Sequence, residues 1–465
     1  MRARLHDCAG SVTLVALCFT AVLAIALSSY LALYQRSYDF STRLLHEDRA
    51  RQLAQTGLEE ALWALNQDTW TGSGPSSDTP WNTSGPNRTV TLAYGSLGQG
   101  ATGQVTLTVA NFASAGPAWP AITSTATITL DDGHVFTKTL QAATGPAPLF
   151  GNAIASVNSY VSFTSGGTVD SWNSRPDNNP ATAVVAYSFT AGTPANYAAV
   201  IAAADSGVTS VALSQALVYG YLATTGKAVS YSTSGSPPGR VKGPATAAAV
   251  DVDPGLLGKS AFIPAASVFA IVPPPASGPN YGGLLNTVLD LVAALLSAPA
   301  TVDTYKINGD LIITGVPLLA PSLTVSRPLK LIVTGNLTIN GSGQITVTPT
   351  GSLELFVAGD VSLGANGIDN QTHDPRKVAL FCSSSSTVDS AQYTSAADFY
   401  GVIYSENKPI DIQQNATFYG ALLSGQYVRF SAGATNPQFH YDTALRNVRF
   451  SGVTTPYIIT LLTEP

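Results

Sequence analysis

The sequence predicts a mainly β protein with one long α-helix at its N-terminus. An uncharged run from Cys8 to Gln35 continues into a charged segment without proline, which predicts a membrane-spanning helix extended by a stem. Alternating β-branched segments in residues 88–143 predict a small antiparallel sheet. Short apolar strands that recur at about 19–26 residues after residue 149 predict a right-handed parallel β-helix.

The composition favours an extracellular protein rich in β-structure. Only 11% of the 465 residues are charged, about half the usual share for a globular protein. The net charge of -6 provides no basic surface, so we expect no nucleic-acid partner. Cys8, Cys18 and Cys382 have no metal-binding spacing, and we expect Cys382 to be a buried structural thiol. We expect no metal and no cofactor.

We expect residues 1–10 to form a leader and residues 11–66 to form the transmembrane and stem helix. The uncharged run exceeds the roughly 18–20 residues that a bilayer requires and the roughly 7–15 residues of a signal-peptide core. Arg2 and Arg4 precede the run, which predicts a single-pass protein with a cytoplasmic N-terminus and a periplasmic or extracellular head. A secretory signal peptide that is cleaved within the run is the alternative.

The stem has the pattern of an amphipathic helix. Its small and apolar residues Ala54, Leu58, Ala61 and Leu65 follow i, i+4, i+7, i+11 spacing and therefore form one stripe. Together with the membrane segment, this predicts a rod of about 55 residues, or roughly 80 Å.

The N-terminal residues resemble a known family. The short basic leader ends in Gly10, Ser11-Val12-Thr13-Leu14-Val15 opens the apolar helix, and the helix continues into the segment RQLAQTGLEEAL that begins at Arg51. This arrangement resembles the type IV pilin-like proteins, specifically the PilX-type minor pilins and the K-type pseudopilins of type II secretion. The resemblance implies a prepilin peptidase that cuts between Gly10 and Ser11. It also implies an inner-membrane location and partner subunits that pack through the N-terminal helix.

Val15 departs from the pattern of most pilins. In most of the family the fifth mature residue is a glutamate that pairs with the N-terminal amine of a neighbouring subunit. A buried carboxylate requires such a partner, and a subunit with no neighbour above it has none. Val15 therefore indicates a minor, tip or initiation subunit instead of a major pilin.

Residues 67–87 are rich in Gly, Pro, Ser and Asn and predict a linker. The sheet predicted for residues 88–143 would pack on the stem, as pilin heads do, with a hairpin turn at Asp131–Gly133. Four alternating segments supply its strands: Thr89–Tyr94, Gln104–Ala110, Ala121–Leu130 and His134–Gln141.

The β-helix is predicted for residues 149–450 because turn-strand phrases repeat there. Glycines 309, 335 and 359 are 26 and 24 residues apart in three similar phrases, and the phrase Phe-Tyr-Gly or Phe-His-Tyr recurs at residues 399, 418 and 439. We expect residues 246–300, with a short helix at 284–296, to be an insertion or a cap, and residues 451–465 to be a C-terminal tail. The aromatic phrases resemble the repetitive β-helical domain found downstream of PilX-type N-termini.

Few residues are candidates for chemistry. We expect Asp310 and Asp360 to bond turn amides, and the Phe-Tyr pairs to form an internal ladder, with a carbohydrate-stacking platform as the alternative. We expect residues 373–377 (HDPRK) to be a solvated loop, with a ligand or catalytic loop as the alternative. His440 and Asp442 could form a metal or acid/base pair, but we expect them to cap the solenoid. We assign no catalytic residue.

We therefore expect a non-enzymatic, PilX-like minor pilin or pseudopilin that serves pilus or secretion-pseudopilus assembly and displays a β-helical head. The first alternative is a membrane-tethered adhesin or carbohydrate-binding protein, with surface glycans as partners. The second is a polysaccharide-active β-helix enzyme, which requires acids within about 5–10 Å of each other in one groove.

Overall fold

The computed structural model divides the chain into two compact units. Unit 1 comprises Met1–Ala147 and Pro456–Pro465, and unit 2 comprises Pro148–Thr455. The structure describes residues 9–67, 81–82, 87–98, 100–111, 119–177, 182–190, 193–204, 209–224, 228–231, 240–242, 270–279, 281–297, 299, 301–315, 322–364, 366–383, 391–393, 397–431, 433–434, 436–448, 450 and 457–464. The predicted leader and linker lie largely outside these residues.

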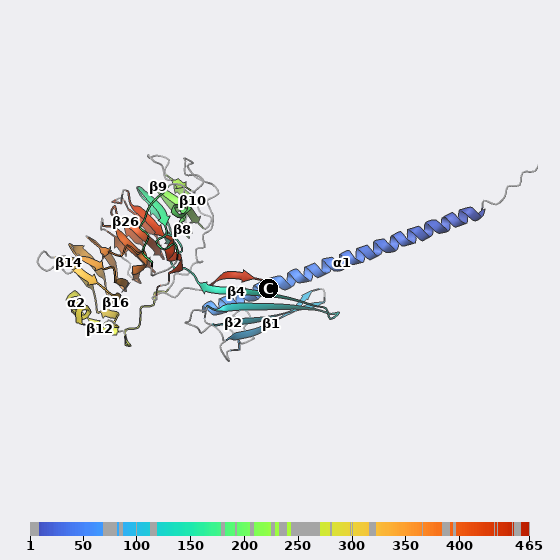
Figure 1. The fold of residues 1–465 in the computed structure, drawn as a ribbon, viewed down its shortest axis with the longest axis horizontal. Coiled ribbons are helices and arrows are strands. Elements are labelled where there is room, and N and C mark those ends of the chain that lie inside the picture. Colours follow the sequence, from blue (N-terminus) through green and yellow to red (C-terminus); the bar gives the residue numbers. More distant parts are fainter. Residues whose placement is uncertain are drawn as a thin grey trace, which may run out of the picture. The chain divides into compact units, whose positions relative to one another are not determined.

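One helix runs through unit 1. Helix α1 (Ala9–Gln67) has 59 residues, which corresponds to about 88 Å (Figure 1). The prediction of a long N-terminal helix is thus confirmed. No proline interrupts it, so every interior amide can donate to the carbonyl four residues earlier.

The second half of α1 packs on an antiparallel sheet with the strand order β1-β2-β3-β4-β29. Strands alternate between buried and solvent-facing residues, as in β2, where every second side chain from Ala101 to Val109 is buried. The helix supplies the other side of this core with the predicted stripe, in which Ala54, Leu58, Ala61 and Leu65 are all buried. The strands are β1 (Arg88–Gly98), β2 (Ala101–Ala110), β3 (Ala121–Leu130), β4 (Val135–Pro146) and β29 (Tyr457–Thr463).

The C-terminal residues correct the prediction of a tail at 451–465. Strand β29 pairs antiparallel with β4, so that Tyr457 lies opposite Pro146 and Thr463 lies opposite Gln141. Asn66 of α1 fixes this strand by accepting from the Tyr457 amide at 2.6 Å and donating to its carbonyl at 3.0 Å. The apolar residues of β29 complete the edge of the sheet, and unit 2 is inserted between two neighbouring strands of unit 1.

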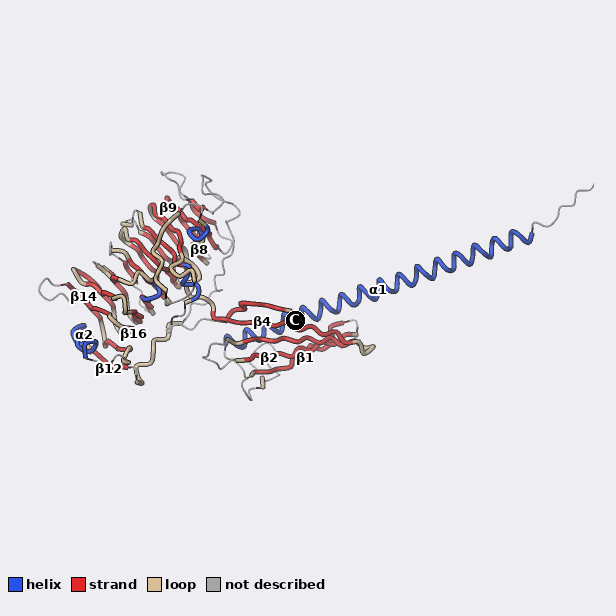
Figure 2. The backbone as a smooth tube through the Cα atoms, in the orientation of Figure 1, coloured by secondary structure: helices blue, strands red, loops and turns tan. Residues whose placement is uncertain are grey.

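Unit 2 consists of short parallel strands that stack in register, with Gly and Asn at the corners, as in a parallel β-helix (Figure 2). Its first face contains β12 (Tyr281–Leu285), β13 (Thr304–Ile307), β16 (Pro328–Val333), β19 (Ser352–Val357), β22 (Val378–Cys382), β24 (Phe399–Ser405), β26 (Thr417–Ser424), β28 (Gln438–Asp442), β5 (Ile154–Ser156), β7 (Gly166–Trp172), β8 (Ala199–Ala203), β9 (Thr209–Thr224) and β11 (Arg240–Lys242).

Two further faces complete the coils. The second face contains β14 (Leu311–Gly315), β17 (Leu337–Gly341), β20 (Val361–Leu363), β23 (Ala391–Tyr393), β25 (Ile410–Ile412), β27 (Val428–Phe430), β6 (Val161–Phe163) and β10 (Ala228–Tyr231), with β9 between the last two. The third contains β15 (Ser322–Val325), β18 (Gln344–Val347) and β21 (Ile368–Asn370). The mainly β fold class with a small antiparallel sheet and a large array of parallel strands is confirmed.

The coils do not stack in chain order. Strands β5 to β7 at the start of unit 2 pair with β26 to β28 near its end, so the first coil lies in the middle of the stack. The next coils, β8 to β11, extend the stack in one direction, and β12 begins it at the opposite end. Strand β12, which belongs to the predicted insertion, therefore lies at the end of the stack, as a cap would, whereas Ile271 of the insertion contacts Glu406 within the stack.

Helix α2 (Val288–Ser297) belongs to this end and packs against β12, β14 and β15. Its buried Val288 and Leu291 join the core of unit 2. The helix begins four residues later than the predicted start at residue 284. The difference arises because Leu284 and Leu285 pair with β13 and so form the end of a strand.

Candidate functional site

The first half of α1 is the largest apolar surface in the described part of unit 1. An 18-residue window of the helix has a mean hydropathy of 2.3, and none of it is buried. Leu14, Phe19, Leu23, Ile25 and Leu33 are all more than half exposed. By length and composition this helix can cross a membrane.

The predicted processing site lies at the start of this helix. Gly10 and Ser11 are in the first turn of α1, and Val15 follows one turn later with an exposed fraction of 67%. Cleavage after Gly10 and the special role of Val15 remain predictions.

Repeated turns lie between the first and second faces of unit 2, and side-chain hydrogen bonds join the turn of each coil to that of the next. Asp310 Oδ1 accepts from the amide of Asn336 at 2.7 Å, and Asn336 Oδ1 accepts from the amide of Asp360 at 2.7 Å. The amides of Gly335 and Gly359 each donate at 2.9 Å to the equivalent glycine one coil earlier. The expected role of Asp310 in bonding a turn amide is therefore observed directly.

The repeated phenylalanines form an internal ladder. Phe399, Phe418 and Phe439 lie in register on β24, β26 and β28 and are each 1% exposed. Their ring centroids are 5.7 and 6.1 Å apart. Stacked aromatic rings at this spacing contribute to the core beyond the area that they bury.

The residue after each phenylalanine points to the outer side of the same strands. Tyr400 and Tyr419 stack face to face at 4.1 Å, and His440 continues the stack at 4.9 Å. His373 lies at 4.7 Å from the Tyr400 ring, and Tyr187 lies at 3.8 Å from the His440 ring. Neighbouring rings therefore occupy both faces of Tyr400 and of Tyr419.

His440 is part of a buried polar group. Its Nδ1 lies 2.7 Å from Asp170 Oδ1, and the Tyr187 hydroxyl donates to Asp170 Oδ2 at 2.7 Å. Burial and this hydrogen bond to Asp170 raise the pKa of Tyr187, which therefore remains a neutral donor. The expectation that His440 and Asp442 cap the solenoid is wrong, because β28 is paired on both sides by β26 and β7.

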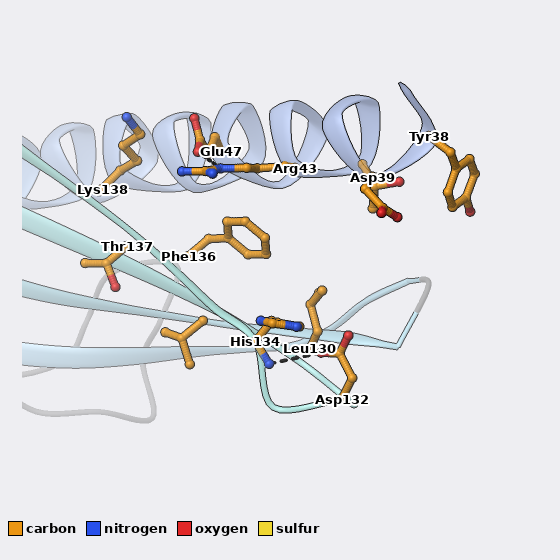
Figure 3. A pocket seen from close by; sticks show the side chains of 12 residues that line it. Tyr38, Asp39, Arg43, Glu47, Leu130, Asp132, His134, Phe136, Thr137 and Lys138 are labelled. Carbon is orange, nitrogen blue, oxygen red and sulfur yellow. Dashed lines mark hydrogen bonds and ion pairs between the residues drawn. The ribbon is translucent and has the colours of Figure 1, made fainter. Parts of the chain in front are cut away.

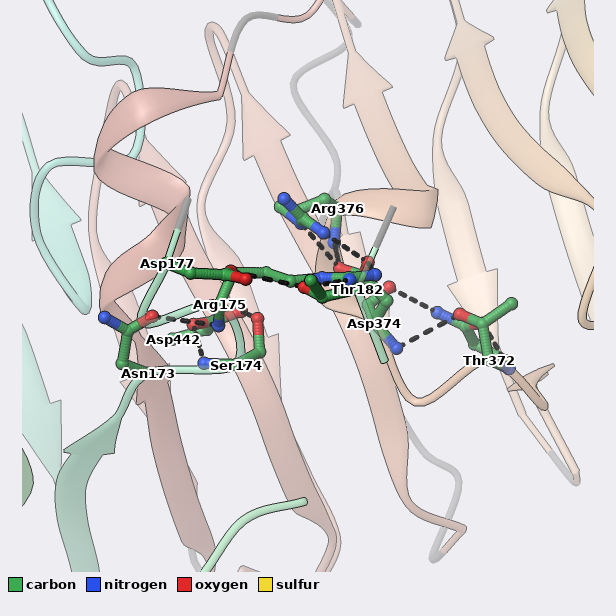
Figure 4. A network of polar contacts seen from close by, with 10 residues as sticks. Asn173, Ser174, Arg175, Asp177, Thr182, Thr372, Asp374, Arg376 and Asp442 are labelled. Carbon is green, nitrogen blue, oxygen red and sulfur yellow. Dashed lines mark hydrogen bonds and ion pairs between the residues drawn. The ribbon is translucent and has the colours of Figure 1, made fainter. Parts of the chain in front are cut away.

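A second buried network surrounds Asp374 (Figure 4). Asp374 accepts from Arg376 Nε at 2.8 Å and Nη2 at 2.7 Å, and from Arg175 Nη2 at 3.2 Å. Burial raises the pKa of Asp374, but the hydrogen bonds and positive charge of Arg376, supported by Arg175, outweigh it and hold the pKa below its ordinary value. Asp374 is only 1% exposed, so the expectation of a solvated loop at residues 373–377 is wrong for this residue.

Asp442 occupies the adjacent part of the network. It accepts from the amide and hydroxyl of Ser174, at 3.0 and 2.5 Å, and from the amide of Ala444 at 3.0 Å. Burial raises its pKa despite these hydrogen bonds. Since Ser174 binds Asp442 and the next residue, Arg175, binds Asp374, this dipeptide joins strands that are distant in sequence.

The arrangement of these acids favours a structural role. Asp170, Asp374 and Asp442 are each at most 2% exposed, and protein donors occupy both oxygens of each carboxylate. A substrate would have to displace these donors. Within the described residues, no group of three or more His, Cys, Asp or Glu residues is placed to hold a metal ion.

Sequence reasoning missed Asp170, Ser174, Arg175 and Tyr187. No local pattern marks Asp170, Ser174 and Arg175, because they have partners 199–270 residues away. Tyr187 bonds Asp170 across 17 residues, but it lies outside any repeated phrase. Cys382 was anticipated correctly: it is fully buried, and its Sγ lies 3.4 Å from the carbonyl oxygen of Gly359.

Unit 1 contains a groove of about 830 Å³ between α1 and the hairpin formed by β3 and β4 (Figure 3). Its helix side includes Tyr38, Asp39 and Arg43, and its hairpin side includes His134 and Lys138. The groove therefore combines aromatic rings with charges of both signs.

The fold and these sites define a mainly β protein of two units whose N-terminal helix is apolar enough to cross a membrane. The family model described as "Domain of unknown function (DUF7305)" matches residues 322–448, less than half of the chain, from β15 to the 3-10 turn at Thr443–Asn447. No curated protein matches the sequence. Among solved structures, the crystal structure of the competence-associated pilin ComZ from Thermus thermophilus is similar at 11% identity, covering 90% of this chain and 97% of that chain. Its TM-score is 0.24, and at that value the likeness carries no argument about this chain.

Proposed function

We propose that this chain is a non-enzymatic, pilin-like envelope protein of the PilX-type minor pilin or pseudopilin class, and that it displays its β-helix unit from a membrane-embedded helix. The observation that carries the proposal is the division of α1 into two halves. From Ala50 onward the helix supplies the buried stripe of unit 1, whereas residues 14–40 are exposed and predominantly apolar. Such a surface requires cover from a bilayer or from other apolar helices.

The proposed topology places the N-terminus in the cytoplasm and both units in the periplasm or outside the cell. Arg2 and Arg4 precede the apolar run, and the next positive charge, Arg36, follows it. The partners would be the inner membrane, a prepilin peptidase and the helices of other pilin-like subunits. Val15 would place the chain at a position where no neighbouring amine has to be neutralised.

Mass spectrometry of the intact protein extracted from membranes tests the processing step. We expect a mature N-terminus at Ser11. A Gly10→Val variant should retain the leader, because the side chain would obstruct a cleavage site that accepts glycine, whereas the control Ala9→Val should still be cleaved. An intact Met1 in the natural sequence, or cleavage near residue 26, would refute the pilin-like function.

Oxidative cross-linking tests the packing of helices. Cys18 is exposed on α1, so a neighbouring helix that packs there brings its own cysteine or a bifunctional reagent within reach. We expect Cys18-dependent adducts with other subunits in membranes that contain the assembly system, and their loss in Cys18→Ala. Adducts that persist in Cys18→Ala, or a protein that carbonate releases from membranes, would contradict the proposal.

A separate experiment tests whether the chain is an adhesin that binds surface glycans. The covered faces of the Tyr400–Tyr419 stack do not favour sugar stacking at that position. A glycan array probed with the full chain should therefore give no binding. Specific binding to one class of glycan would replace the assembly role with an adhesive one.

A further inference from the structure

One end of unit 1 carries two neighbouring hairpin turns. The β1–β2 turn and the β3–β4 turn lie side by side, because the Asp131 amide donates to the Gly100 carbonyl at 2.8 Å. The groove lies at this end, between the β3–β4 hairpin and α1 residues 38–47. Asn66 contacts Tyr457 at the opposite end of the sheet, where the chain leaves for unit 2.

The groove begins just beyond the uncharged part of α1. Gln35 is the last residue of that run, so Tyr38 lies about 4.5 Å and Arg43 about 12 Å further along the helix axis. The headgroup layer on each side of a bilayer is about 5–8 Å thick. If the uncharged run is embedded, Tyr38 and the nearest part of the groove are therefore at the level of the headgroups, and Arg43 lies just beyond them.

Aromatic side chains mark the same level. Tyr30, Tyr34 and Tyr38 repeat every four residues and form a stripe on the helix, and each is more than 60% exposed. Tyrosine is enriched where a membrane helix leaves the hydrocarbon core, because its ring is apolar and its hydroxyl is polar. The stripe ends in Tyr38, which also lines the groove (Figure 3).

The hairpin side of the groove matches a headgroup layer in its chemistry. Val135 is 57% exposed, and it lines the groove with the half-buried Phe136. His134 can approach phosphate groups, and Asp132 can approach an ammonium group. Lys138 adds positive charge to the groove, although its ammonium also pairs with Glu464 at 3.1 Å. Both signs of charge thus surround an exposed apolar side chain.

We propose that this end of unit 1, comprising the groove and the β3–β4 turn, docks on the membrane surface and binds zwitterionic phospholipid headgroups, with Val135 in contact with the lipid layer. The inference rests on the proposed function, because the embedded helix brings the groove to the bilayer. Phospholipid is the occupant that the geometry favours, since the groove continues directly from the apolar helix and carries both charges of a zwitterionic headgroup. Docking would fix the tilt of the head above the membrane.

Depth-dependent quenching tests the proposal. The full-length protein, with Cys8 and Cys18 replaced by alanine, is labelled with a fluorophore at Val135→Cys or, as a control, at Asn87→Cys. It is reconstituted in vesicles of equal parts phosphatidylethanolamine and phosphatidylcholine that contain lipid spin-labelled near the headgroup. Asn87 is exposed and lies at the other end of the sheet, about 26 Å from the level of Val135.

We expect strong quenching of the fluorophore at position 135 and little quenching of the fluorophore at position 87. Equal and weak quenching at both positions, in protein that resists carbonate extraction, would overturn the docking but leave the proposed function intact. Protein that does not remain with the vesicles would overturn both. Disulfide formation between copies of the unlabelled Val135→Cys protein, together with no lipid quenching of the labelled protein, would show that a second copy of the chain occupies the groove and would also overturn the inference.

Discussion

Gly57 allows a sharp test of how the stem packs on its sheet. A Cβ at this position would lie 2.5 Å from Ser124 Oγ and 2.7 Å from both Leu107 Cδ2 and Val105 Cγ1. These three partners are completely buried, so they have no open space into which to move. Helix and sheet approach so closely here because residue 57 has no side chain.

We expect Gly57→Ala to destabilise unit 1, although helix propensity alone predicts that the change stabilises it. In an exposed helix this change stabilises by about 0.8–1 kcal/mol. Overpacking of a filled core costs about 1–3 kcal/mol, and three simultaneous overlaps in a fully buried site place the cost at or above the upper limit. We therefore expect Gly57→Ala to lower the free energy of unfolding of unit 1 by about 2 kcal/mol or more, and Gly57→Val to lower it further.

Urea unfolding of the full chain in detergent, followed by tryptophan fluorescence, measures this change. Four of the five tryptophans belong to unit 1, so the signal reports mainly on that unit: Trp63, Trp70, Trp81 and Trp119. The midpoint should fall at an unchanged slope. The control Thr56→Ala, on the exposed side of the same turn, should raise stability by a few tenths of a kcal/mol. A midpoint that rises in Gly57→Ala would refute the close packing of helix on sheet.

Four further predictions concern unit 2 and the terminal strand. At neutral pH, Asp374→Asn should lower the free energy of unfolding of unit 2 by about 3–5 kcal/mol, because the buried Arg175 loses its charged partner. Thermal melts followed by circular dichroism measure this change. The pKa of Asp374 is lower in the folded state than its unfolded value of about 3.9, so the ionised carboxylate stabilises unit 2 above that pH. The stability of the unmutated protein should therefore fall as the pH drops below about 4, and it should fall less in Asp374→Asn. Parallel pH profiles for the two proteins would contradict this. Gly420→Ala should prevent the coil from closing, because φ is +149° and a Cβ would overlap the carbonyl oxygen of Gly401 in the preceding coil. The control Gly95→Ala, where a Cβ meets open space, should leave the melting temperature in the same melts unchanged. Deleting 457–465 should lower the urea midpoint of unit 1, and an unchanged midpoint would show that β29 adds nothing.

Local patterns were sufficient for most elements of this fold, although not for β29. The uncharged run and the stripe that begins at Ala54 specify one helix, because hydropathy and the 3.6-residue period are properties of a continuous segment. The phrases around Gly309, Gly335 and Gly359 specified stacked coils, since a repeated turn that needs the same backbone conformation places equivalent residues in register. The internal ladder predicted for the Phe-Tyr pairs is confirmed for the phenylalanines at residues 399, 418 and 439, and it is wrong for Tyr400 and Tyr419, which lie on the outer side of the strands.

The candidate polar site could not be predicted in this way. The loop at residues 373–377 reads as hydrophilic, yet Asp374 is buried because Arg175, 199 residues earlier, supplies a charged donor. His440 was expected to cap the solenoid, but the structure pairs it with Asp170 across 270 residues. Burial of a charge depends on its partner, and the chain contains no local signal for a partner so distant.

The sequence by itself determined the long helix, the antiparallel hairpins and the repeating coils. Only the tertiary structure decided that the C-terminal residues return to unit 1 as β29, and that the first coil of unit 2 stacks against its last. Hydropathy and period act over a few turns or strands, so they specify which elements form. Which strand edges meet is decided by the free energy of the whole packed arrangement, because many edges in this chain offer similar hydrogen bonds and similar apolar faces.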